Sequence, residues 1–119
     1  MSTVKNNYKI DLPDGRVATR GTNRDYHAIL VAKIPADEFR QECYDYAEKC
    51  TKCNNPKYAA EYEELAEAIK EDAVDYYLVF SWHGTRDLAE KAAKSNGMGS
   101  FRRNLERRYS RVEPVIIEF

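Results

Sequence analysis

Two apolar runs rich in β-branched and aromatic residues constrain the fold of this chain more than any other feature. Residues 26–34 read YHAILVAKI and stop at Pro35, and residues 76–83 read YYLVFSWH and stop at Gly84. Continuous apolar runs of this length, bounded by turn residues, predict buried strands. We therefore expect both runs to be strands of one sheet.

The segment between the two runs has the period of helices. Acids stand in its first turn at Asp37 and Glu38, where the helix dipole favours negative charge. The sequence Asn-Asn-Pro at residues 54–56 then breaks the pattern, and a second helical stripe follows. The pattern predicts an αα-hairpin. Its apolar positions are Phe39, Cys43, Tyr46, Ala47 and Cys50 in the first helix, and Tyr58, Tyr62, Leu65 and Ile69 in the second.

Shorter elements complete the order β-β-β-α-α-β-α-α-β. Residues 8–12 and 17–20 flank a Pro-Asp-Gly turn and predict a hairpin. Thr85 is suited to cap a short helix over residues 86–95, with Leu88, Ala89 and Ala92 turned inward. Ser100 is expected to cap a second short helix, and residues 113–119 predict a last strand.

These elements predict one α+β domain over residues 1–119. We expect a mostly antiparallel sheet of four or five strands, with the αα-hairpin and two shorter helices packed on it. A chain of 119 residues with 43% hydrophobic residues is large enough to bury a single core.

Charge is unevenly distributed along the chain, although the net charge is only -1. Residues 1–33 carry six basic and three acidic side chains, residues 34–80 carry five and twelve, and residues 81–119 carry eight and five. The overall charge does not predict a nucleic-acid partner. This distribution has two interpretations. The acidic middle can be the solvated side of the two expected helices, or folding can bring the two basic ends onto one face.

The densest cationic cluster is the stretch SNGMGSFRRNLERRYSRV at residues 95–112. A glycine-containing turn ahead of a helix N-terminus can hold an anion, and arginines at helical spacing can hold phosphate or an acidic protein surface. A solvated face is the third interpretation. The first candidate binding surface consists of Arg102, Arg103, Arg107, Arg108, Arg111, Tyr109, Gly97, Gly99 and Ser100.

The second helix of the expected αα-hairpin provides a second candidate surface. Its acids can mimic the charge of nucleic acid toward a basic partner, and its tyrosines can serve as aromatic anchors. This surface consists of Tyr58, Tyr62, Glu61, Glu64, Glu67 and Glu71.

The cysteines and histidines suggest other chemistry less strongly. Cys50 and Cys53 have half of a zinc-site spacing, and Cys43 could join them, but Cys43 and Cys50 also fit the core face of the first helix. We expect no metal and no cofactor. With no apolar leader and no apolar run of about 20 residues, a reducing, cytoplasmic setting without a membrane is predicted.

A small enzyme built around His83, Ser81 and Arg86 is a further alternative. A strand end followed by glycine and a helix start is a common place for a site. Strand rise separates Ser81 and His83 by about 7 Å, which predicts no direct contact between nucleophile and base. No nucleophile elbow, P-loop or dinucleotide fingerprint occurs in the sequence.

Two blocks of the sequence carry a further pattern. The first is NRDYHAILVAK at residues 23–33, and the second is VFSWHGTRDLAEKAAKS at residues 79–95. They contain a Tyr-x-Ala-aliphatic strand, a later Ser-Trp strand and a Leu-Ala-x-Lys-Ala helix. In this arrangement the chain resembles small bacteriophage-encoded accessory proteins of unknown function. The resemblance implies a protein that binds and blocks a host factor, such as a defence system, and it implies no catalytic residues.

We therefore expect stoichiometric binding to a host protein or a protein–nucleic-acid complex, with anti-defence or host-takeover inhibition as the setting. The first alternative is nucleic-acid binding through the expected helix from Arg102 to Arg111. The second is the small enzyme around His83.

Overall fold

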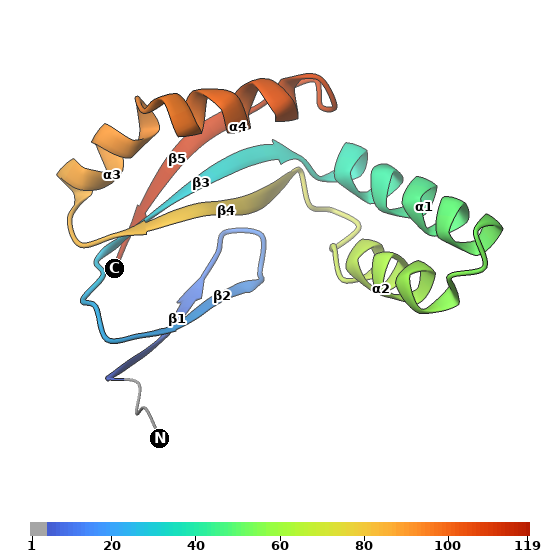
Figure 1. The fold of residues 1–119 in the computed structure, drawn as a ribbon, viewed down its shortest axis with the longest axis horizontal. Coiled ribbons are helices and arrows are strands. Elements are labelled where there is room, and N and C mark those ends of the chain that lie inside the picture. Colours follow the sequence, from blue (N-terminus) through green and yellow to red (C-terminus); the bar gives the residue numbers. More distant parts are fainter. Residues whose placement is uncertain (1–4) are drawn as a thin grey trace.

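The computed structural model describes residues 5–119, which form five strands and four helices in the predicted order (Figure 1). All strand pairs are antiparallel, which confirms the predicted α+β class. The strands are β1 (Asn6–Asp11), β2 (Val17–Thr22), β3 (Ala28–Pro35), β4 (Asp75–His83) and β5 (Glu113–Glu118). The helices are α1 (Ala36–Lys52), α2 (Pro56–Glu67), α3 (Arg86–Ala93) and α4 (Asn96–Glu106).

Strand β3 is buried on both faces because it is the central strand of a sheet with the order β4-β3-β5. Its even-numbered residues from Leu30 to Ile34 belong to a core that α4 closes, and Ile29 and Val31 belong to a second core under the β1–β2 hairpin (Figure 1). Successive side chains of a strand alternate between faces. This double burial explains why β3 is a continuous apolar run rather than an alternating one.

The β1–β2 hairpin is a separate two-stranded sheet among the described residues, whereas the sequence predicts one sheet of four or five strands. The hairpin stacks on a face of the larger sheet, where Leu12 and Ala18 cover Ile29 and Val31. Burial of that apolar face accounts for the stacking. The strand count is confirmed, and the single sheet is wrong.

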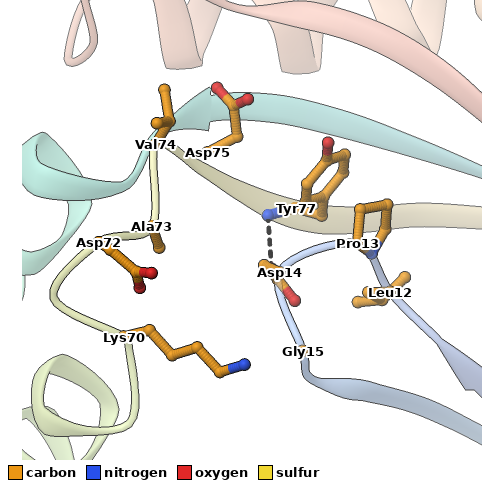
Figure 2. A pocket seen from close by; sticks show the side chains of 10 residues that line it. All are labelled: Leu12, Pro13, Asp14, Gly15, Lys70, Asp72, Ala73, Val74, Asp75 and Tyr77. Carbon is orange, nitrogen blue, oxygen red and sulfur yellow. Dashed lines mark hydrogen bonds between the residues drawn. The ribbon is translucent and has the colours of Figure 1, made fainter.

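Side chains of the β1–β2 turn bind the free edge of β4 (Figure 2). The N–H of Tyr77 donates to Asp14 Oδ2 at 3.0 Å, and the Tyr77 carbonyl accepts from the Arg16 guanidinium. Asp14, 4% exposed, also accepts from Arg16 Nε at 3.0 Å. The Arg16 Cζ lies 3.8 Å from the centroid of the Tyr76 ring. Because an open strand edge is a template for pairing, these contacts protect β4.

Helices α1 and α2 project from one end of the sheet as a helical hairpin (Figure 1). The radius of gyration is 16.0 Å, whereas about 13–14 Å is expected for a compact chain of this length. Phe39 stacks on Tyr76 with ring centroids 3.9 Å apart and attaches α1 to the sheet. The chain leaves and rejoins the sheet at neighbouring points, since Pro35 pairs with Asp75 and the Ala36 N–H donates to Val74 O at 3.0 Å.

The buried stripe of α2 is shifted from the predicted one. Ala59, Ala66 and Ile69 are buried, while Tyr58 is 52% exposed and Leu65 is 44% exposed. The small side chains of Ala59 and Ala66 allow α2 to lie close to Cys43 and Ala47 of α1, so the alanines take the interface. In α3, Thr85 caps the helix as predicted, but Leu88 is exposed rather than turned inward.

Candidate protein-binding surface

Helix α4 begins five residues earlier than the sequence predicts. Ser95 is its N-cap, with Oγ accepting from the Met98 N–H at 3.2 Å, and the side chain of Met98 is 1% exposed. Gly97, Gly99 and Ser100 therefore lie inside the helix rather than in a turn before it, and neither glycine has a positive φ. Burial of Met98 outweighs the poor helix propensity of the two glycines. The predicted turn at these residues is wrong, and anion binding by them stays a prediction.

The five arginines do not share one helix, because α4 ends at Glu106 and Arg107 is its C-cap. Arg108 and Arg111 lie in the segment that leads to β5. Arg103, Arg107 and Arg111, which are spaced four residues apart in the sequence, are thus divided between a helix and the segment after it. The turn after Glu106 is fixed by Tyr109, whose side chain is buried in the core below it.

Three of the arginines are held by carboxylates of the same chain. Arg102 pairs with Glu106 at 2.8 Å, Arg108 pairs with Glu42 of α1, and Arg111 pairs with Asp75 at the start of β4. Arg103 donates to Ser100 Oγ at 3.3 Å. Within residues 5–119, Arg107 makes no ion pair or side-chain hydrogen bond. These contacts leave Arg103 and Arg107 as the arginines of the cluster that no carboxylate engages in the described part of the chain.

Glu42 joins α1 to the segment after α4. Its carboxylate accepts from Arg108 Nε at 3.0 Å and from the Tyr109 hydroxyl at 2.6 Å. The hydrogen bond from Arg108 lowers the pKa of Glu42 by more than partial burial raises it. Burial and the contact with Glu42 in turn raise the pKa of Tyr109.

We expect the Glu42 contacts to make stability depend on pH in the acid range. Because the folded pKa of Glu42 lies below its usual value of 4.5, the contribution is present above pH 4.5 and is lost as pH falls through the folded pKa. Glu42→Gln should cost about 1 kcal/mol at pH 7, since the pair is partly exposed. Urea unfolding of both proteins between pH 7 and 3 measures the difference. A gap that stays constant to pH 3 contradicts this assignment.

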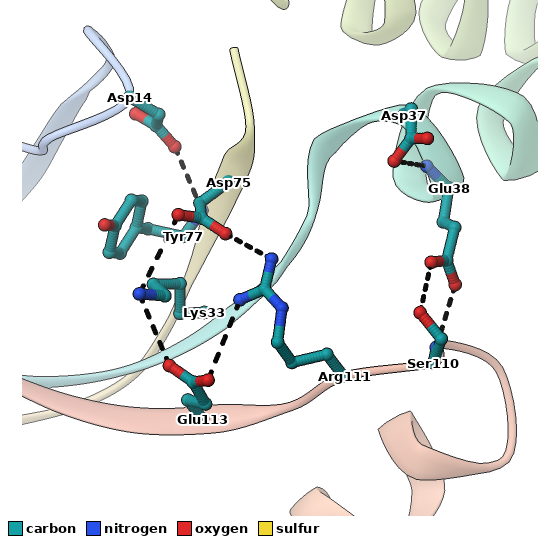
Figure 3. Close-up of polar contacts among 9 residues, drawn as sticks. All are labelled: Asp14, Lys33, Asp37, Glu38, Asp75, Tyr77, Ser110, Arg111 and Glu113. Carbon is teal, nitrogen blue, oxygen red and sulfur yellow. Dashed lines mark hydrogen bonds and ion pairs between the residues drawn. The ribbon is translucent and has the colours of Figure 1, made fainter.

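A second network of ion pairs lies where the strands of the large sheet meet the α1–α2 hairpin (Figure 3). Lys33 Nζ lies 3.3 Å from Glu113 and 3.8 Å from Asp75, and Arg111 binds the same two carboxylates. The hydrogen bond to Glu113 is the largest cause of a raised pKa at Lys33. Nearby, the N–H of Ser110 donates to Glu38 at 2.8 Å. The segment from Arg102 to Arg111, called the arginine segment below, thus holds α1 and β4 in place.

A cavity of about 380 Å³ lies between the β1–β2 turn and the loop that joins α2 to β4 (Figure 2). Two of its carboxylates are engaged: Asp14 binds Arg16 and Tyr77, and Asp75 binds Arg111 and Lys33. The lining residues are Leu12, Pro13, Asp14, Gly15, Lys70, Asp72, Ala73, Val74, Asp75 and Tyr77.

The acidic surface on α2 is the candidate that the fold leaves open. Tyr58 and Leu65 are exposed, and Glu61 and Glu64 line a hollow of about 500 Å³ with Leu65 and Ala68. Two residues predicted for this surface do not belong to its exposed part. Tyr62 is half-buried and stacks on Tyr46 of α1 with centroids 5.4 Å apart, and Glu71 follows α2 in the loop to β4. Glu67 is exposed on α2.

Ser81 and His83 are in contact, contrary to the prediction from strand rise. Ser81 Oγ lies 2.6 Å from His83 Nε2. The two side chains lie on one face of β4 and lean toward each other. Their polar atoms are therefore closer together than the backbone spacing predicts. Burial lowers the pKa of His83 below its usual value of 6.5. Arg86 does not join them, since it pairs with Glu90 at 3.0 Å and Glu118 at 3.1 Å.

The three cysteines differ in how deeply they are buried. Cys43 of α1 is buried, Cys50 is half-buried and Cys53 is exposed, and all three are free thiols. Burial raises the pKa of the Cys43 thiol above its usual value of 9.0, which keeps it unreactive. Within residues 5–119, no group of three or more His, Cys, Asp or Glu residues is placed to hold a metal ion.

None of the helices described here has both the length and the apolar character needed to cross a membrane. No protein-family model, curated protein or solved structure matches the chain. The resemblance to phage accessory proteins therefore stays a prediction.

Proposed function

We propose that this protein acts by stoichiometric binding to another protein, with the helical hairpin of α1 and α2 as its contact arm. The observation that carries the proposal is the projecting hairpin, which presents Tyr58 and Leu65 to solvent among unpaired acids. Exposed aromatic and aliphatic residues at the centre of a polar surface are the usual anchors of protein interfaces. In the phage setting, the partner is a host protein, alone or on nucleic acid, and binding inhibits it.

The ion pairs of the arginine segment support the choice of the hairpin over the arginines. Arg102, Arg108 and Arg111 already neutralise carboxylates of this chain. Moving Arg108 or Arg111 to phosphate would break the contacts with α1 and β4, respectively. A nucleic-acid complex would therefore depend on Arg103 and Arg107, and it would weaken steeply with salt.

Affinity capture with matched variants tests the proposal. The tagged protein, a hairpin variant (Tyr58→Ser with Leu65→Ser) and an arginine variant (Arg103→Ala with Arg107→Ala) are each incubated with host lysate, once untreated and once treated with nuclease. We expect one protein to be retained by the wild type and the arginine variant, and to be lost from the hairpin variant. Native mass spectrometry of the purified complex should give a fixed stoichiometry.

The opposite pattern overturns the proposal. If the arginine variant loses the partner and the hairpin variant keeps it, the contact surface is the arginine segment. If recovery disappears with nuclease and with moderate salt, the protein binds nucleic acid.

The contact between Ser81 and His83 favours a nucleophilic serine as a second candidate function. A neutral His83 can take the proton of Ser81 while Oγ attacks an electrophile. With a fluorophosphonate probe, an Oγ–P bond should form, fluoride should leave and the protein mass should rise by one adduct. Ser81→Ala and His83→Ala should both abolish the adduct. An unmodified wild-type protein after prolonged incubation removes this candidate.

A further inference from the structure

Helix α2 carries two apolar stripes side by side, and α1 covers one of them. The covered stripe contains Ala59 and Ala66, with Tyr62 stacked on Tyr46 at its margin. The second stripe contains Tyr58, Leu65 and Ala68, which are exposed at helical spacing, with Glu61 at the position between Tyr58 and Leu65. A helix with one partner needs one such stripe. The second stripe is apolar surface that nothing in residues 5–119 covers.

The dimensions of the uncovered stripe match a helical occupant. Tyr58 and Ala68 are ten positions apart, which corresponds to about 15 Å along a helix axis, or roughly three turns. The surface beside Leu65 is a shallow, open depression bordered by Glu61, Glu64 and Ala68, along which a partner helix can lie. Recognition of a helix typically uses a few apolar anchors along such a length.

The acidic side chains on this face of α2 indicate which kind of partner can bind the stripe. Glu61 and Glu64 line the same hollow as Leu65 and Ala68. Within the described chain, none of the acids of α2 takes part in an ion pair, and the helix has one base, Lys57, against Glu61, Glu63, Glu64 and Glu67. A cationic partner therefore gains attraction along the rim without displacing an internal pair.

We propose that the α2 stripe of Tyr58, Leu65 and Ala68 binds an amphipathic helix of a partner protein whose apolar residues are flanked by lysine or arginine. This inference rests on the proposed function and specifies the contact face and the chemistry of the partner. A second copy of this chain fits the stripe poorly, because two α2 helices face to face would oppose glutamates to glutamates. Nucleic acid is repelled by the same carboxylates.

The test uses a fluorescein-labelled peptide of leucine and lysine with leucines at helical i, i+3 and i+4 spacing. We expect fluorescence anisotropy to show saturable binding that Leu65→Ser weakens by about 10-fold or more. Glu61→Gln with Glu64→Gln should weaken it mainly at low salt. Tyr44→Ser, at a residue that is 41% exposed on α1, is the matched control and should leave binding unchanged. Circular dichroism checks that each variant is folded.

Three results overturn the inference. One is equal binding of a peptide with the same composition in scrambled order, and another is equal loss from Leu65→Ser and Tyr44→Ser. The third is a wild-type dimer in sedimentation that Leu65→Ser dissociates, which would make a second copy the occupant. None of these outcomes decides the proposed function, because the capture experiment tests the hairpin without assuming a basic helical partner.

Discussion

Leu30→Ala is expected to lower the free energy of unfolding by about 3–5 kcal/mol, because it removes buried methyl groups and leaves a cavity that the neighbouring residues cannot fill. Leu30 is 0% exposed at the centre of β3 and belongs to the core that Met98 and Leu105 close. A domain of this size is stable by about 5–15 kcal/mol, so the variant should lose a large share of its stability. Urea unfolding followed by circular dichroism measures the loss.

Leu65→Ala is the matched control for Leu30→Ala. The same chemical change at a side chain that is 44% exposed should alter stability by about 0.5 kcal/mol or less. A similar cost at both positions would mean that the exposed stripe of α2 is packed in solution. A loss below about 1 kcal/mol at Leu30 would contradict the central position of β3.

Asp14→Ala is the second change with a large expected effect. It removes the carboxylate that accepts from the N–H of Tyr77 and from Arg16, in a site where Asp14 is 4% exposed. The free energy of unfolding should fall by about 2–4 kcal/mol, because the Arg16 charge and a strand-edge N–H lose their partner. Thermal and urea unfolding measure the loss.

The edge of β4 gives Asp14→Ala a second readout. Because a free strand edge promotes pairing between chains, the variant should associate at high concentration, which light scattering after size exclusion detects. Asp14→Asn keeps one oxygen acceptor for Tyr77. It should lose less stability than Asp14→Ala and, like the wild type, should stay monodisperse. Equal behaviour of both variants would show that the charge of Asp14, rather than the cap on Tyr77, carries the effect.

The strands of the large sheet could be predicted because their signal is local. Residues 26–34 and 76–83 contain strong β formers and stop at Pro35 and Gly84, and the observed strands are Ala28–Pro35 and Asp75–His83. The stacking of β1 and β2 on the sheet face could not be predicted. It depends on Leu12 and Ala18 meeting Ile29 and Val31, a contact between segments far apart in the chain.

The start of α4 was missed because two serines compete as its cap. Ser100 stands after two glycines, which favour a turn, so local propensity places the cap there. The structure uses Ser95 because Met98 is then buried in the core. Such a preference for a tertiary contact over local propensity leaves no signal in a single sequence.

The candidate site was predicted only in part, since α2 contains two overlapping apolar patterns. Residues 58, 62, 65 and 69 form one helical stripe, and residues 59, 62, 66 and 69 form another. The first stripe has the larger side chains and the stronger hydrophobic signal. Close packing against Cys43 and Ala47 selects the second, which exposes Tyr58 and Leu65. The contact between Ser81 and His83 was missed because backbone spacing does not describe the reach of side chains.

The position of the helical hairpin makes it an insertion into a simple β-turn. Strands β3 and β4 are antiparallel neighbours, Pro35 pairs with Asp75, and Ala36 and Val74 are joined by a backbone hydrogen bond. A short turn can span that gap, so residues 36–74 form a cassette between two adjacent strands. A different helical hairpin at this position would leave the strand order unchanged, provided that it kept the contacts that Phe39 makes with Tyr76 and that Glu42 makes with Arg108.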